Sequence, residues 1–145
     1  MKRLLDTSVL VAAMVAAHPA HARSVRFLER ALAGRCESCV STHSLAEIYA
    51  VLTRMPTSPR ISPDVARRLV HDNLETGAAR LVALDATDYL AVLDRMAQSG
   101  FAGGVIYDAL IVQAACKAKA DEIITLNEAD FARLCSGLPI RISTP

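Results

Sequence analysis

The sequence contains no tryptophan, and aromatic residues make up only 4% of its 145 residues. So few aromatic rings argue against an extended surface on which nucleic-acid bases stack. An excess of one charge is also missing, because 16 lysines and arginines oppose 15 aspartates and glutamates. The resulting net charge of +1 excludes a strongly basic surface that binds nucleic acid over the whole protein. A local basic face remains compatible with the composition.

Long hydrophobic runs are missing as well. The apolar run at residues 9–17 has nine residues, too few to cross a bilayer. It imitates a secretion signal, since Lys2 and Arg3 precede it and Ala20-His21-Ala22 follows it. Asp6 interrupts the apolar stretch, however, and cleavage would remove the strand that is expected to anchor the sheet. We therefore expect a cytoplasmic protein without membrane contact.

The sequence has four cysteines, and nothing else marks it as a small secreted scaffold held by disulfides. Cys36 and Cys39 have the spacing of a zinc or redox pair. Inside a strand, however, residues three apart face opposite sides. Neither Cys116 nor Cys135 completes a second close pair. We expect reduced thiols that pack in the core.

Motifs of other enzyme classes are missing. The glycines at residues 100–104 lack the G-x-G-x-x-G spacing of dinucleotide-binding proteins, and no strand runs directly into them. No G-x-S-x-G motif surrounds Ser8, which argues against a serine hydrolase. His18 and His21 are expected to lie in a surface turn rather than to bind a metal.

The sequence does contain a repeated alternation of short apolar runs and helical segments, which is typical of β-α-β units and a parallel sheet. No linker or internal repeat interrupts it, so we expect residues 1–145 to form one α/β domain. The expected strands are one that ends at Asp6 and residues 36–41, 81–84, 121–126 and 140–142. The expected helices run from Ser8 to about His18, over residues 21–32, 43–54 and 63–76, from about residue 86 to residue 99, around Asp108, and from Glu128.

Two features of the expected helices remain open to interpretation. Thr7 or Ser8 is predicted to cap the first helix, and Thr42 the helix over residues 43–54. Three arginines at helical spacing lie on one face of the helix over residues 21–32. They form either an ordinary solvated face or a stripe that contacts phosphates. These arginines are Arg23, Arg26 and Arg30.

Acidic residues recur where the expected strands end. Asp6 ends the first strand, Glu47 and Asp108 lie early in helices, and Asn127 and Asp130 follow the strand at residues 121–126. The carboxyl ends of parallel strands meet at one edge, where ligands bind in open α/β sheets. Two carboxylates about 4 Å apart repel by roughly 4 kcal/mol at an effective dielectric near 20, so such a cluster needs a cation. Its oxygen ligands favour Mg²⁺ or Mn²⁺ over zinc.

Four short blocks in this order resemble the PIN domain, and more closely the VapC-like toxin ribonucleases of toxin–antitoxin pairs. Together they span nearly the whole chain. The blocks are Leu5-Asp6-Thr7-Ser8, Ser44-Leu45-Ala46-Glu47-Ile48, Tyr107-Asp108-Ala109-Leu110-Ile111 with Ala114-Ala115, and Thr125-Leu126-Asn127-Glu128-Ala129-Asp130-Phe131.

The resemblance implies a fold, an activity and partners. The fold would be a three-layer α/β/α arrangement around a parallel five-stranded sheet of order 3-2-1-4-5. The activity would be the hydrolysis of RNA phosphodiester bonds with one or two Mg²⁺ or Mn²⁺ ions. The protein would be the toxin of a toxin–antitoxin pair, with frequent homodimers and an antitoxin whose C-terminal tail enters the site.

The resemblance also assigns roles to single residues. Asp6, Glu47 and Asp108 would be metal-binding and catalytic acids. Many relatives carry an aspartate where this chain has Asn127, so either Asn127 or the nearby Asp130 fills the fourth position, and Asp130 is predicted to supply the fourth carboxylate. Four polar residues would position the acids and waters: Thr7, Ser8, Thr125 and Asn127.

Two other interpretations fit parts of the pattern. A phosphotransferase of the haloacid dehalogenase kind also begins with an aspartate at a strand end, but it requires a second aspartate where this chain has Ser8. A PIN-like module that binds RNA or protein without cleaving it is the alternative to a nuclease. The acids Asp6, Glu47 and Asp108 argue against a module that only binds, whereas Asn127 in place of an acid keeps that interpretation open.

Overall fold

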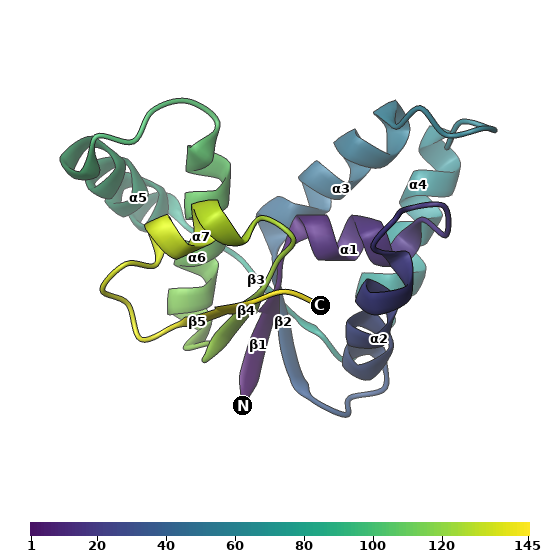
Figure 1. Cartoon of the computed structure of the whole chain (residues 1–145), viewed down its shortest axis with the longest axis horizontal. Coiled ribbons are helices and arrows are strands. Elements are labelled where there is room, and N and C mark those ends of the chain that lie inside the picture. The colour runs from purple at the N-terminus through teal and green to yellow at the C-terminus, as the bar shows by residue number, and fades with distance from the viewer.

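Five parallel strands form the centre of the computed structural model, which describes residues 1–145 (Figure 1). The strand order is β3-β2-β1-β4-β5, as predicted. The strands are β1 (Lys2–Leu5), β2 (Glu37–Ser41), β3 (Arg80–Val82), β4 (Glu122–Ile124) and β5 (Arg141–Ser143). The helices are α1 (Thr7–Met14), α2 (His21–Leu32), α3 (Thr42–Arg54), α4 (Pro63–Val70) with the π-helical turn η1 (His71–Glu75), α5 (Ala86–Ser99), α6 (Val105–Ala118) and α7 (Glu128–Leu134).

Helices cover both faces of the sheet, so the predicted three-layer α/β/α fold is confirmed. Figure 1 shows α1–α4 on one side of the sheet and α5–α7 on the other. Successive residues of a strand point to opposite faces. Leu5 accordingly packs with residues of α1–α4, whereas Leu4 packs with residues of α6 and α7. Both leucines are almost completely buried, which explains why the strand reads as a continuous apolar run.

The first helix is shorter than predicted. α1 ends at Met14 rather than near His18, because Val15 adopts an extended conformation. The strands also differ slightly from the predicted ranges: β3 and β4 are shorter, β5 is shifted by one residue, and β2 begins at Glu37. Cys36 therefore lies just outside the strand in which it was expected. All four cysteines are free, and burial raises the pKa of the Cys39 thiol to about 11.

The predicted caps of two helices are wrong by one or two residues. Asp6, not Thr7 or Ser8, is the N-cap of α1, and its carboxylate accepts a hydrogen bond from the backbone N–H of Ser8 at 3.3 Å. Ser41, not Thr42, is the N-cap of α3, and its hydroxyl accepts from the N–H of His43 at 3.2 Å. Ser41 is both the last residue of β2 and the cap of α3, whereas Asp6 is the single residue between β1 and α1.

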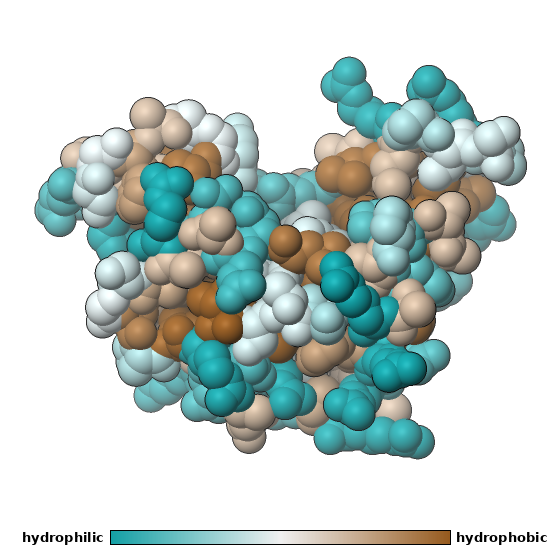
Figure 2. Space-filling view, in the orientation of Figure 1, coloured by the Kyte–Doolittle hydropathy of each residue, from teal (hydrophilic) through white to brown (hydrophobic).

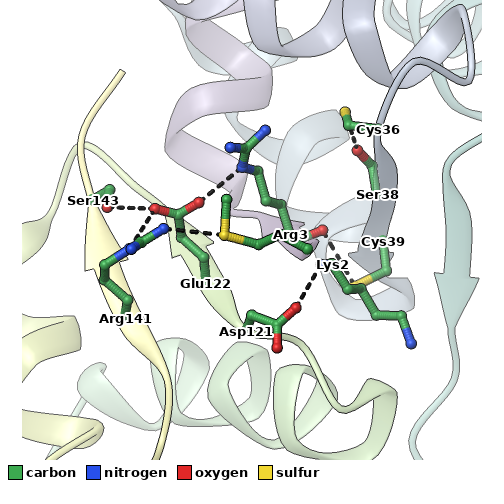
Figure 3. A network of polar contacts seen from close by, with 10 residues as sticks. Lys2, Arg3, Cys36, Ser38, Cys39, Asp121, Glu122, Arg141 and Ser143 are labelled. Atoms are coloured by element: carbon green, nitrogen blue, oxygen red, sulfur yellow. Dashed lines mark hydrogen bonds and ion pairs between the residues drawn. The ribbon is translucent and has the colours of Figure 1, made fainter.

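Glu122 holds the opposite, amino end of the sheet together (Figure 3). Its buried carboxylate accepts hydrogen bonds from Arg3 at 2.8 Å, Arg141 at 2.9 Å and Ser143 at 2.7 Å. These residues come from β1 and β5, which flank β4 on its two sides. Burial opposes the ionisation of Glu122, but the three hydrogen bonds outweigh it and lower the pKa to about 2.

Two further features concern the molecular surface. Arg23, Arg26 and Arg30 are exposed on α2, and none of them forms an ion pair. No helix is long and apolar enough to span a membrane.

Candidate active site

Asp6 lies at the carboxyl end of the central strand β1 and is only 3% exposed. One of its oxygens, Oδ2, accepts hydrogen bonds from the backbone N–H and hydroxyl of Ser8 and from the hydroxyl of Thr125 at 2.7 Å. Burial raises the pKa of Asp6, and these hydrogen bonds partly oppose that rise. None of them involves Oδ1. The carboxylate is therefore fixed through one oxygen, which leaves the other for a ligand.

Glu47 reaches the same edge from the second turn of α3. The hydroxyl of Thr7 donates a hydrogen bond to Glu47 Oε2 at 2.7 Å and lies 3.0 Å from the hydroxyl of Ser44. Thr7 thereby connects α1 to α3 and fixes one oxygen of the glutamate. The other oxygen, Oε1, lies 3.6 Å from Nε2 of His43. Sequence reasoning assigned no role to Ser44 or His43, because only the packing of α1 against α3 brings them here.

Asp108 lies in the first turn of α6 and is half-buried. Its pKa is raised to about 6, first by burial and then by the negative charges of Asp6, Glu47 and Asp130. A hydrogen bond from Asn127 acts in the opposite direction. No lysine or arginine forms an ion pair with Asp6, Glu47 or Asp108. The three acids therefore form a negative site that no lysine or arginine neutralises.

Asn127 connects the two acids in the C-terminal half of the site. Its Nδ2 donates to Asp108 Oδ2 at 3.1 Å and to Asp130 Oδ2 at 3.0 Å. The hydroxyl of Thr125 accepts a hydrogen bond from the backbone N–H of Asn127 at 2.9 Å, which orients the turn after β4. Asp130 also pairs with Arg133 at 3.3 Å and is partly exposed. Asn127 thus occupies the inner position and Asp130 the outer one.

A cavity of about 570 Å³ unites these residues. Figure 2 shows the molecule hollowed between the helices α3 and α4 on one side and α5–α7 on the other. Six of the eight predicted site residues line this cavity, while Thr125 lies behind Asp6 and Asp130 lies outside the lining. The six are Asp6, Thr7, Ser8, Glu47, Asp108 and Asn127.

Other residues give the cavity an apolar side. Val11 and Leu126 line it near Asp6, and Val51 and Met55 line it along α3. His18 lies in the turn between α1 and α2, as expected, and from there it also lines the cavity. His18 and the neighbouring His21 make separate local hydrogen bonds and do not form a metal-binding pair. The cavity therefore combines three acids with an apolar wall.

The donor chemistry of the cavity fits a hard divalent cation. Its potential ligands are carboxylate and amide oxygens, which suit Mg²⁺ and Mn²⁺ and offer no thiolate for zinc. The pKa of Asp108 is raised first by burial and then by the neighbouring negative charges, which a cation would neutralise. No three histidine, cysteine, aspartate or glutamate side chains converge closely enough to hold a metal ion by themselves. Mg²⁺ usually keeps several waters rather than requiring an all-protein cage, so an open set of acids is compatible with it.

Comparisons with known proteins agree with this geometry. The model of the PIN domain family matches residues 3–136. Ribonuclease VapC27 of Mycobacterium tuberculosis is 36% identical over 117 residues, which cover 81% of this chain and 79% of that protein. The structure of VapC20 from the same species, a Sarcin-Ricin loop cleaving toxin, has a TM-score of 0.71 and 17% identity over 90% of this chain and 94% of its own. DNA-bound VapBC of Salmonella typhimurium has a TM-score of 0.68 and 21% identity over 99% and 98% of the two chains.

Proposed function

Since this chain belongs to the PIN domain family, as its four sequence blocks predicted, we propose that it is a divalent-metal-dependent endoribonuclease. The observation that carries the proposal is the cavity in which Asp6, Glu47 and Asp108 meet without a lysine or arginine partner. The similarity to VapC27, which is named a ribonuclease and is 36% identical, supports RNA as the substrate. VapC20, a Sarcin-Ricin loop cleaving toxin whose fold this chain shares, is consistent with the same substrate class.

Two acids would hold the ion, which is Mg²⁺ or Mn²⁺. Asp6 offers Oδ1, because its Oδ2 is occupied by Ser8 and Thr125. Asp108 faces the same cavity from α6. A divalent ion bound there supplies Lewis-acid stabilisation of the phosphate charge and lowers the pKa of a water that attacks it. Binding of the ion would also relieve the repulsion among the acids, which otherwise raises the pKa of Asp108.

Glu47 would orient the attacking water or accept its proton. Because Thr7 donates to Oε2, that oxygen is fixed and Oε1 is the one left to receive a proton from water. A proton acceptor acts effectively only when it is held within hydrogen-bond reach of its donor. The link from Thr7 to Glu47 supplies that restraint, and the hydroxyl of Ser44 next to Thr7 supports it. Thr7 is thus a positioning residue for Glu47.

The fourth acid position has two candidates with different surroundings. Asn127 lines the cavity and donates to Asp108, so we propose that it orients this carboxylate. Asp130 adds negative charge near Asp108, and we propose that it supplies the fourth carboxylate of the metal site. Its pairing with Arg133 reduces the negative charge that it offers to a cation, so it would be the weakest metal ligand among the four acids.

We further propose that the protein acts in the cytoplasm as the toxin of a toxin–antitoxin pair and forms a homodimer. The apolar side of the cavity would receive part of an antitoxin chain. The exposed apolar residues of α5 offer an interface for a second copy, since Tyr89 is 44%, Leu90 61% and Leu93 49% exposed. An apolar patch of this kind often marks an association surface.

Cleavage of single-stranded and structured RNA by a nuclease-free preparation tests the proposal. We expect activity with Mg²⁺ or Mn²⁺, none in excess chelator, and none for Asp108→Asn. Asp64→Asn, a change at an exposed acid of α4, is the matched control and should remain active. Undiminished cleavage in chelator would refute the metal requirement, and RNA binding without cleavage would favour a binding module. Expression of the wild type, but not of Asp108→Asn, should slow bacterial growth.

A further inference from the structure

Two aromatic rings stack beside the acids. His43, the second residue of α3, lies one turn before Glu47, and Tyr107 in α6 immediately precedes Asp108. Their ring centroids are 5.5 Å apart and their planes are inclined by only 5°. This parallel arrangement is among the preferred geometries of aromatic pairs. The pair therefore joins the two helices that carry two of the three central acids.

The outer ring of this pair is available to a ligand. Tyr107 is 52% exposed, whereas the side chain of His43 is only 18% exposed. The hydroxyl of Tyr107 makes no hydrogen bond, and neither residue belongs to any of the three hydrophobic clusters. Packing of the core therefore does not explain the placement of Tyr107. His43 backs its ring and restricts its orientation, as a binding surface requires.

The approach to Tyr107 is also open. The loop before α6 contains Gly103 and Gly104, and a Cβ atom built on either glycine would meet no atom within 4 Å. The loop that leads into α6 is therefore uncrowded at these two positions, and Tyr107 itself is half-exposed.

We propose that Tyr107, backed by His43, is a stacking platform for an unpaired nucleobase of the RNA next to the cleaved phosphate. The proposal rests on the proposed ribonuclease function, because an RNA strand at Asp108 and Glu47 brings bases beside those acids. Every base has an aromatic face, so stacking binds a nucleotide without reading its identity. Bases in a duplex already stack on their neighbours, so the platform selects single-stranded or looped RNA.

Binding of labelled single-stranded RNA, with Ca²⁺ in place of Mg²⁺ to prevent cleavage, tests the platform directly. Loss of a base–aromatic stack weakens binding by roughly 5- to 150-fold, so we expect Tyr107→Ala to raise the Kd within this range. Tyr107→Phe keeps the ring and should bind like the wild type. His43→Ala should give a smaller loss, because the ring of Tyr107 remains. Tyr49→Ala removes a tyrosine of similar exposure on α3 that does not line the cavity, and it should bind normally.

An RNA series with one abasic nucleotide at successive positions identifies the stacked base. At one position, the abasic nucleotide should weaken binding to the wild type as much as Tyr107→Ala weakens binding of intact RNA. The Tyr107→Ala variant should bind this abasic RNA and intact RNA equally well. A 2-aminopurine at that position should lose fluorescence on binding to the wild type but not to Tyr107→Ala. In the cleavage assay, Tyr107→Ala should raise KM and leave kcat nearly unchanged.

The outcomes separate this inference from the ribonuclease proposal. If the wild type cleaves RNA while Tyr107→Ala has an unchanged Kd and KM, the platform is refuted and the nuclease stands. If the wild type neither binds nor cleaves any RNA, the ribonuclease proposal itself fails. If Tyr107→Ala weakens the binding of abasic RNA by the same factor as the binding of intact RNA, the effect comes from the protein's own structure. That result would overturn the platform. Thermal melting of each variant verifies that it is folded.

Discussion

The side-chain amide of Asn127 donates a hydrogen bond of 3.1 Å to Asp108. The same nitrogen lies 3.0 Å from a carboxylate oxygen of Asp130, so a neutral donor separates two negative charges. This donor favours the ionised form of Asp108, whereas burial and the neighbouring acids disfavour it. Without a bound cation, Asn127 is one of the few groups that stabilise the charge of this site.

The first prediction concerns this donor. Asn127→Asp replaces two hydrogen bonds with repulsion, so the free energy of unfolding in chelator should fall by about 1–3 kcal/mol. Mg²⁺ should reduce this loss, because binding to the folded state stabilises it. Urea denaturation with and without Mg²⁺ measures both effects. Gln98→Glu, the same change of amide to carboxylate at an exposed position of α5, should show no recovery by Mg²⁺.

The second prediction compares the two candidates for the fourth acid position. If Asp130 supplies the fourth carboxylate, Asp130→Ala should raise the Mg²⁺ concentration for half-maximal cleavage more than Asn127→Ala does. If Asp130 is only an acid in the first turn of α7, its loss should cost roughly 0.3–1 kcal/mol of stability. A metal titration of both variants, together with their melting temperatures, distinguishes these roles. An unchanged metal dependence for Asp130→Ala would leave a site of three carboxylates.

The third prediction separates the two roles of Asp6, which caps α1 and lines the cavity. Asparagine is also a good N-cap, so Asp6→Asn should abolish cleavage while it keeps most of the stability. Asp6→Ala should abolish cleavage and also lose roughly 0.5–2 kcal/mol from the missing cap. Cleavage assays and urea denaturation of the two variants test this difference. Cleavage by Asp6→Asn at the wild-type rate would contradict the assignment of Asp6.

The fourth prediction follows from the pKa of Asp108, which is raised to about 6 in the folded protein. A carboxylate whose folded pKa exceeds its unfolded value near 3.8 favours folding below that value. The contribution is lost as the pH rises through about 6. In metal-free protein, Asp108→Asn should therefore gain stability relative to the wild type between about pH 4 and pH 7. Because Asp108 is half-exposed, we expect about 1–2 kcal/mol.

Denaturation of wild type and Asp108→Asn in chelator at a series of pH values measures this gain. Asp64→Asn, at an exposed acid outside the cavity, is the matched control variant. If the difference in free energy of unfolding between wild type and Asp108→Asn is constant across the pH series, burial and the neighbouring acids do not raise the pKa of Asp108.

The fifth prediction has the opposite sign and concerns Glu122, whose pKa is lowered to about 2. A carboxylate with a depressed pKa stabilises the fold above its unfolded value, near 4.5, and this stability is lost as the pH falls towards 2. Glu122→Gln should cost about 1–3 kcal/mol at neutral pH and progressively less in acid. Its cleavage rate per folded molecule should not change, because Glu122 lies at the opposite end of the sheet from the cavity. A loss of cleavage without a loss of stability would refute this separation.

The acids of the site were predictable because each is fixed by a local rule. Asp6 ends an apolar run, and Glu47 and Asp108 lie early in helices, so a parallel sheet brings them to one edge. The strand order followed from the resemblance to a family and not from the periodicity of the chain. The helix caps were misplaced because strand and helix follow each other with one intervening residue at Asp6 and with none after Ser41, so the cap lies earlier than the sequence pattern indicates.

Contacts between distant segments were not predictable. The hydrogen bond from Thr7 to Glu47 and the stacking of His43 on Tyr107 depend on how α1, α3 and α6 pack. No spacing in the sequence encodes these approaches. His18 was assigned to a surface turn, since nothing in its local sequence indicates that the turn after α1 reaches the cavity.

The position of β1 between β2 and β4 has a consequence for the time at which the protein becomes active. The hydrogen-bond partner of Asp6, Thr125, lies 119 residues later in the sequence, and so does the neighbouring strand β4. A nascent chain that lacks residues 122–127 has neither the second neighbour of β1 nor Asn127. The cavity therefore comes into existence only after residues 122–127 have been synthesised, so the ribosome is not exposed to a finished site while it makes the preceding residues.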